Sequence, residues 1–274
     1  MSIVTNDRLQ KNLRVALFKI GAGQEIFTGL ENKMVNEMVS CRIAEKHLSQ
    51  IVHERRATRH FGPAPVPEED LQRILRAGLE SPSGYNLQPW RFIVVRGQPQ
   101  RELLAEAAMA QAKVKEAPLV IVACGDTEAW RSGDLEEMLR LARERNGSDE
   151  ARYESIRRNV WAALGSPGDA GGIAPDLSVW INRHVMVALT TMMWMAEALG
   201  YDTAPLEGFW ESKVKALLKI PKSVRVVALL AIGHGTKEDK PYGGRFDVSR
   251  TVFVEEWGRN TFAIPPIDVV SAAT

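Results

Sequence analysis

The chain has 274 residues, of which 45% are hydrophobic and 25% are charged, a composition typical of a folded globular domain. The formal net charge is only +1, so we expect neither nucleic acid nor a membrane surface as a partner. No stretch approaches the roughly 20 apolar residues of a membrane span, and the N-terminus does not resemble a signal peptide. The two cysteines lack the spacing of a metal site or a disulfide framework, which favours a cytoplasmic protein without a bound metal.

The N-terminal part of the chain gives mixed signals. It combines weak apolar periodicity with a Gly-Ala-Gly break at 21–23 and a helical pattern around 31–50. We interpret residues 1–48 as an N-terminal extension, followed by a main domain over 49–260 and a tail over 261–274.

The pattern becomes clearer from Pro67 onward. The stretch PEEDLQRILRAGLE (67–80) predicts a helix, because it has acidic residues in its first turn and one apolar stripe. Two strands are predicted, RFIVVRG (91–97) and PLVIVACGD (118–126), and the second should be buried on both faces. Residues 100–116 between them are helical by composition.

The second half of the chain continues this alternation. Residues 127–165 are charged and helix-prone, with a Gly-Ser break at 147–148. NRHVMVALTTMMWMAEALG (182–200) predicts a buried helix, and VRVVALLAIGHG (224–235) predicts a central strand. The tail from 236 on contains short β-like pieces such as TVFVEEW. The order favours an α+β or α/β class with a central sheet, whose strand directions stay open.

Three stretches carry residues suited to ligand binding. HERRATRHF (53–61) holds three arginines, whose planar forks suit phosphate, although such a triplet alone is more often a solvated helix end. In SPSGYNLQPW (81–90), Gly84 permits a close backbone approach and Asn86 offers both a donor and an acceptor. These groups suit a flat heterocycle, or else satisfy local backbone. APLEGF (204–209) exposes backbone amides, but alone it is more often a simple turn.

Together, these stretches resemble a known family. RRATRHF, then SPSGYNLQPWRF, then PLEGF after a long apolar helix and GGR beyond the last strand stand in the order of the nitroreductase family of FMN enzymes. The resemblance extends from about residue 50 to about 257. It implies an α+β fold with three α/β/α layers, a central mixed sheet and a lid over about 127–178. It also implies an obligate homodimer with flavin at the interface.

The resemblance implies a set of flavin-binding residues. Arg55 and Arg56 would lie near the phosphate, and Arg59 with Lys113 near the N1/O2 edge of the ring. A backbone N–H of the PLEGF turn would face flavin N5, and the SPSGYN loop would come from the other subunit. Ala57 stands where the family usually has Ser. The complete implied set is Arg55, Arg56, Ala57, Arg59, Pro82, Ser83, Gly84, Asn86, Lys113, Pro205, Leu206, Glu207, Gly208 and Arg245.

The implied activity is electron transfer from NAD(P)H through FMN to a nitroaromatic, quinone or similar electron-poor acceptor, by a ping-pong cycle. No side chain stands out as a general acid, so the chemistry would take place on the flavin. Two alternatives stay open. One is reductive dehalogenation or oxygen-consuming flavin chemistry on the same fold. The other is a non-catalytic flavin-binding protein, which is supported by Ala57 and by Gly243 and Gly244, where relatives often have polar residues.

Overall fold

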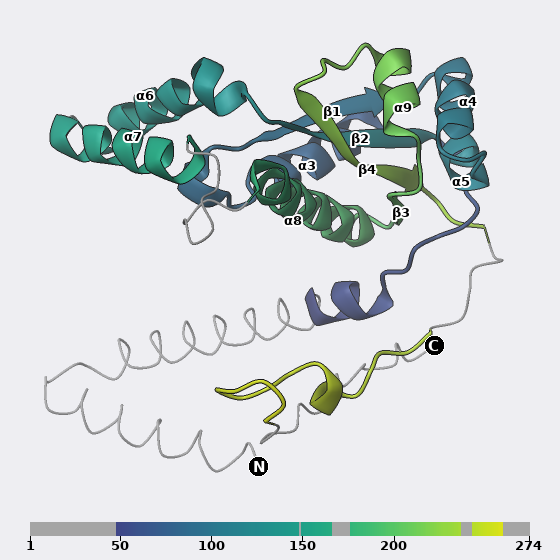
Figure 1. Ribbon diagram of the computed structural model, residues 1–274. Helices are drawn as coiled ribbons and strands as arrows, with labels where there is room; N and C mark the ends of the chain where they lie inside the picture. Colours follow the sequence, from purple (N-terminus) through teal and green to yellow (C-terminus); the bar gives the residue numbers. More distant parts are fainter. Residues whose placement is uncertain (1–47, 148, 166–175, 237–242, 260–274) are drawn as a thin grey trace, which may run out of the picture. The chain divides into compact units, whose positions relative to one another are not determined.

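The computed structural model describes residues 48–147, 149–165, 176–236 and 243–259 (Figure 1). The chain divides into two compact units, one of Met1–His53 with Pro266–Thr274 and one of Glu54–Pro265. Of the predicted helix around 31–50, only its last three residues are described, and they are helical. The predicted domain boundaries stay a prediction. Among the described helices, none combines the length and apolar character needed to cross a bilayer.

A four-stranded sheet forms the centre of the second unit, in the spatial order β1-β2-β4-β3. All neighbouring strands pair antiparallel, with Val122 of β2 opposite Ile93 of β1 and Leu229 of β4. A mixed sheet was expected. In the described residues, its parallel pairing is limited to one isolated bridge between Ala57 and Thr203. The strands are β1 (Trp90–Val95), β2 (Leu119–Asp126), β3 (Asp202–Leu206) and β4 (Val224–Gly233).

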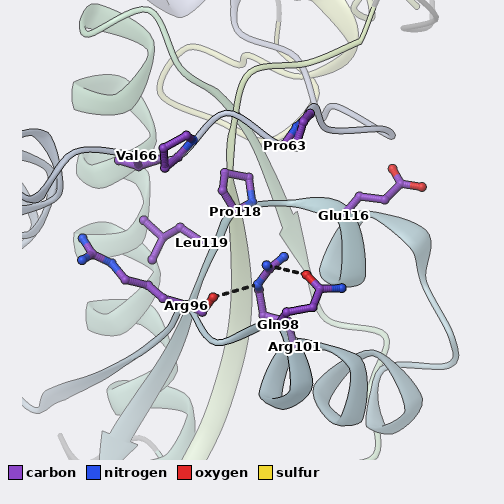
Figure 2. Close-up of a pocket in the computed structure, with 9 residues that line it drawn as sticks. Pro63, Val66, Arg96, Gln98, Arg101, Glu116, Pro118 and Leu119 are labelled. Carbon is purple, nitrogen blue, oxygen red and sulfur yellow. Dashed lines mark hydrogen bonds between the residues drawn. The ribbon is translucent and has the colours of Figure 1, made fainter.

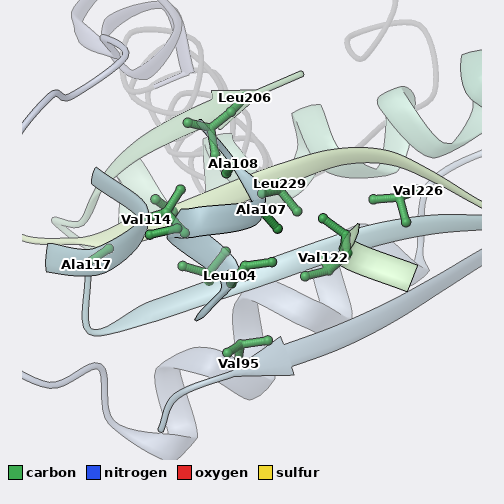
Figure 3. Packing of buried hydrophobic residues seen from close by; sticks show 14 of the residues in the cluster. Val95, Leu104, Ala107, Ala108, Val114, Ala117, Val122, Leu206, Val226 and Leu229 are labelled. Carbon is green, nitrogen blue, oxygen red and sulfur yellow. The ribbon is translucent and has the colours of Figure 1, made fainter. Parts of the chain in front are cut away.

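Helices cover both faces of this sheet, which confirms the three-layer α+β fold (Figure 1). Alternate residues of β2 point to opposite layers: Leu119 and Ile121 pack with one set of helices, and Val120 and Val122 with the other. Figure 3 shows the second of these clusters. The first layer contains α3 (Glu68–Leu79) and α8 (Leu177–Ala198), and the second contains α4 (Gln98–Ala107), α5 (Ala112–Glu116) and α9 (Glu211–Leu218).

The helix α8 is the longest in the described residues, and it packs closely on α3. A Cβ atom at Gly78 of α3 would lie 2.2 Å from Cε of Met192, so only glycine allows this approach. The helix begins earlier than the predicted residue 182, because Asp176 accepts a hydrogen bond from the N–H of Ser178 and caps its first turn. Gly200, with φ at 82°, follows its end as the sequence predicted.

Three stretches differ in detail from their expected structure. APLEGF, which taken alone is more often a turn, begins within β3, an edge strand that tolerates Pro205. Residues 100–116, helical by composition, belong mainly to two helices, α4 and α5, which are separated at Met109 and Ala110, both with positive φ. TVFVEEW contains turns and no strand; a short 3₁₀ helix, η3 (Val248–Arg250), precedes it.

Part of the expected lid is a helical pair, α6 (Leu135–Asn146) and α7 (Glu150–Leu164). Their apolar faces share one cluster, and the break predicted at 147–148 is confirmed at Gly147, whose φ is 82°. A short π-helical segment, η2 (Trp130–Asp134), precedes α6. It is tied to β1 because Arg91 donates to both carboxylate oxygens of Asp134, at 2.9 and 2.7 Å.

Candidate functional site

The arginine-rich stretch lies along the edge of the sheet. The N–H of Thr58 donates to the carbonyl of Thr203 at 3.0 Å, which places residues 55–59 beside β3. Asp202, at the start of β3, accepts a hydrogen bond from the N–H of Gly235 at 2.7 Å. The sheet edge therefore fixes the backbone from which the three arginines project.

Arg55 is a half-buried cation in a site that favours an anion. Its Nη1 atom is buried and has no hydrogen-bond partner in the described part of the chain. Burial lowers the pKa of Arg55, the carboxylate of Glu197 opposes this effect, and the positive charges of Arg245 and Arg56 add to it. A phosphate group would supply both the missing acceptor and the missing negative charge.

A second pair of cations lies at the other end of this stretch. Burial lowers the pKa of Lys113, and the nearby charge of Arg59 lowers it further. In the described ranges, Lys113 has no carboxylate in ion-pair contact. Gln111 donates from Nε2 to the carbonyl of Gly208 at 2.7 Å, so the PLEGF turn lies beside the same helix, α5. These contacts bring Arg59, Lys113 and Gly208 into one region.

The loop from Ser81 to Pro89 lies elsewhere, against the middle of α8. The N–H of Gly84 donates to Nε2 of His184 at 2.9 Å, and the hydroxyl of Ser81 donates to the hydroxyl of Thr191 at 2.9 Å. Two successive residues of this loop, Tyr85 and Asn86, have φ near +55°. Left-handed backbone at residues other than glycine is strained, and such strain concentrates at functional sites.

One chain does not bring the two groups of predicted residues together. Glu197, which interacts electrostatically with Arg55, stands 13 positions after His184 on α8. At 1.5 Å per residue this is about 20 Å of helix, and Thr191, the other contact of the loop, lies about 9 Å before Glu197. The loop also leads into β1, whereas the arginine stretch lies beside β3 at the opposite edge of the sheet. One chain therefore holds the predicted site residues in two separate groups, each a candidate half-site.

Two surface hollows in the described residues are large enough to hold a ligand. The first, of about 420 Å³, is lined by Pro63, Arg96, Arg101 and Glu116 among others (Figure 2). Its polar groups are already used: Arg101 donates to the carbonyls of Arg96, Lys115 and Ala117 and to the Gln98 side chain. The second, of about 310 Å³, lies between the loop residues Asn86 and Gln88 and helix α6. Only this one adjoins a predicted half-site.

The structure divides the predicted residues into groups. Arg56 and Arg245 both act electrostatically on Arg55, while Arg59 and Lys113 form the second pair. Sequence reasoning did not place Glu197, Gln111 or His184 in the site. Glu197 carried a signal, because it is an acidic residue near the end of a largely apolar helix. Gln111 and His184 carried none, since their importance comes from contacts distant in sequence.

Comparison with known proteins identifies the family. The model of the nitroreductase family matches residues 52–234, so the chain belongs to this family of oxidoreductases. NADH dehydrogenase of Thermus thermophilus is 35% identical over 190 residues, which cover 69% of this chain and 86% of that protein. Among solved structures, ydfN of Bacillus subtilis has a TM-score of 0.69 at 26% identity, covering 77% of this chain and 99% of its own.

A second solved structure, from Exiguobacterium sibiricum, contains FMN. It has a TM-score of 0.66 at 25% identity and covers 75% of this chain and 96% of its own.

Proposed function

We propose that the protein is an FMN-dependent oxidoreductase that moves electrons from NAD(P)H to nitroaromatic, quinone or similar electron-poor acceptors. Family membership and the FMN bound by the Exiguobacterium relative support the cofactor. The observation that carries the proposal is the buried Nη1 of Arg55, a donor without a partner among the described residues, in a cluster of cations. Such a group is costly unless an anion occupies the site.

The residues of the first half-site, beside β3, would contact different parts of the cofactor. Arg55, Arg56 and Arg245 would hold the phosphate, and Arg59 with Lys113 would lie at the N1/O2 edge of the ring. Bound FMN would supply the redox chemistry, by accepting hydride at N5 and passing electrons to the second substrate. Cations at the N1/O2 edge would stabilise the negative charge that reduction places there. A backbone amide of Glu207 or Gly208 would face N5.

We further propose that the protein is a homodimer in which the loop with Pro82, Ser83, Gly84 and Asn86 completes the site of the partner subunit. The separation along α8 of about 20 Å between His184 and Glu197, together with the placement of the two groups at opposite edges of the sheet, supports this arrangement. Helix α8 also exposes Val179, Val187 and Trp194, which are 41%, 41% and 38% accessible and are spaced along one face. An apolar stripe of this kind suits a contact between subunits.

The visible spectrum of the purified protein tests the proposal. We expect flavin absorbance, bleaching on anaerobic addition of NADH or NADPH, and recovery when a nitroarene or quinone is added. Halophenols in place of the nitroarene would distinguish dehalogenation. Sedimentation should give a dimer. A colourless protein that takes up no added FMN would contradict the proposal, and a flavin-loaded protein that NAD(P)H cannot reduce would favour the non-catalytic alternative.

A further inference from the structure

The contact between His184 and the loop is more specific than core packing requires. Nε2 of His184 lies 2.9 Å from the backbone nitrogen of Gly84, and Nδ1 lies 2.7 Å from the carbonyl oxygen of Trp180. The amide of Gly84 can only donate and the carbonyl of Trp180 can only accept. Nδ1 of His184 must therefore carry the hydrogen, which leaves Nε2 as the acceptor. The imidazole is fixed on α8 and aimed at one amide of the loop.

The neighbouring indole makes this contact close as well as directional. The rings of Trp180 and His184 stack at a tilt, with their centroids 4.2 Å apart. A Cβ atom added to Gly84 would lie 3.0 Å from Cζ2 of Trp180 and 3.4 Å from Nε2 of His184. Only glycine lets the backbone rest on the two rings without moving them. The rings of Trp180 and His184 together form the surface on which Gly84 packs, which we call the platform.

The residues on either side of Gly84 have a conformation that needs support. Tyr85 and Asn86 have φ of 54° and 55°, and the short turn is closed by hydrogen bonds from Asn86 N–H to Ser83 and from Leu87 N–H to Gly84. The side chains of Tyr85 and Asn86 are exposed. Because left-handed backbone at these residues is unfavourable, an external anchor is needed to keep it populated.

We propose that His184 is a positioning residue for the cofactor: through the Gly84 amide it holds Ser83 and Asn86 in the geometry that binds FMN. This inference rests on the proposed function. His184 does not touch the flavin itself; it acts through the loop. The imidazole contributes a hydrogen-bond acceptor at one point in space, which a side chain of similar size without an acceptor cannot replace.

The helix provides a matched control. Thr191 stands two turns further along α8 and accepts the hydrogen bond from Ser81, at the beginning of the same loop. Thr191→Val removes that second link between helix and loop but leaves the contact at Gly84. His184→Leu removes the acceptor at Gly84, whereas His184→Gln places an amide oxygen near the former position of Nε2.

The experiment measures the FMN dissociation constant of the apoprotein by quenching of flavin fluorescence, together with the thermal midpoint of each apoprotein. We expect His184→Leu to weaken FMN binding about tenfold, the effect of one hydrogen bond. His184→Gln should recover most of the affinity, and Thr191→Val should bind FMN as the wild type does. The thermal midpoints identify any variant that does not fold. If His184→Leu does not fold, the FMN affinity of His184→Gln tests the inference in its place.

Three outcomes would overturn the inference. Unchanged affinity in His184→Leu would show that the anchor is dispensable. Equal losses in His184→Leu and Thr191→Val would show that any loosening of the loop suffices. Failure of His184→Gln to recover binding would show that the acceptor is not the relevant property. A wild-type protein that binds no FMN would instead contradict the proposed function, so the two failures are distinguishable.

Discussion

The two half-sites on this chain use different forces. The half beside β3 is cationic: Arg55, Arg245 and Lys113 are held near other positive charges, and burial lowers the pKa of Arg55 and Lys113. The loop on α8, residues 81–89, has no charged side chain and depends on backbone amides and strained turns. Electrostatic attraction acts over distance and contributes mainly to the affinity for a ligand. A hydrogen bond from a fixed backbone amide acts only at contact and mainly orients the ligand. In the proposed site, these two tasks would belong to groups that contact different positions along helix α8.

The largest effect is expected from the cationic half. Arg55→Gln removes both the charge and the buried Nη1 donor, so we expect the FMN dissociation constant to rise about 30- to 100-fold, as for a charged hydrogen bond. Arg73→Gln is the matched control, because Arg73 is exposed and pairs with Asp70 at the surface. Fluorescence titration measures both. Equal affinities in the two variants would remove Arg55 from the phosphate site.

The dependence of FMN binding on salt concentration tests the difference between the two half-sites. Raising the KCl concentration from about 0.05 to 0.5 M should weaken FMN binding severalfold, since screening reduces the attraction of partly exposed cations for phosphate. Arg245→Gln should show a flatter dependence on salt, because Arg245 is one of the charges near Arg55. Gly84→Ala should keep the wild-type slope. If Gly84→Ala flattened the slope instead, the division between charge and orientation would be wrong.

Lys113 tests whether the second cation pair reaches the ring. Lys113→Met should make the flavin reduction potential more negative by on the order of tens of millivolts, because a nearby charge stabilises the reduced ring. The matched control is Lys115→Met, since Lys115 is exposed and lies 3.8 Å from Glu102. Anaerobic titration against a reference dye gives both potentials. A shift of the same size in the control would mean that the effect is not local.

The smallest effect is expected at the loop. Gly84→Ala places a methyl group 3.0 Å from Trp180, which must move by a few tenths of an ångström, so we expect FMN binding to weaken about threefold, less than the usual effect of overpacking a core. Gly97→Ala is the control, because no atom would lie within 4 Å of its added Cβ. Isothermal titration can resolve this difference. Tighter binding in Gly84→Ala would show that the loop is not already in its binding geometry.

Much of the fold was predictable because its signals are local. The helix α3 followed from one apolar stripe and three acidic residues in its first turn, and β2 from a continuous apolar run. The three-layer architecture then followed from the family resemblance. The ends of α8 were less clear, since the cap at Asp176 lies before the apolar run that revealed the helix.

The rest depends on contacts that no local pattern encodes. Strand β3 was missed because Asp202 and Pro205 are poor strand residues, tolerated here only at an edge. The arginine stretch was predicted as a phosphate site, but Glu197, which also acts on Arg55, comes from a distant helix. The platform of Trp180 and His184 under Gly84 likewise joins residues about a hundred positions apart.

Helix α8 also restricts how this chain can vary. It carries Glu197 near the arginines and His184 under the loop, so its length and twist set the spacing of both half-sites. Inserting or deleting one residue between them would rotate one end by about 100° relative to the other and shift it by about 1.5 Å. Either change would turn Glu197 away from Arg55 or His184 away from Gly84. Length differences among homologues should therefore be absent from this stretch and confined to loops.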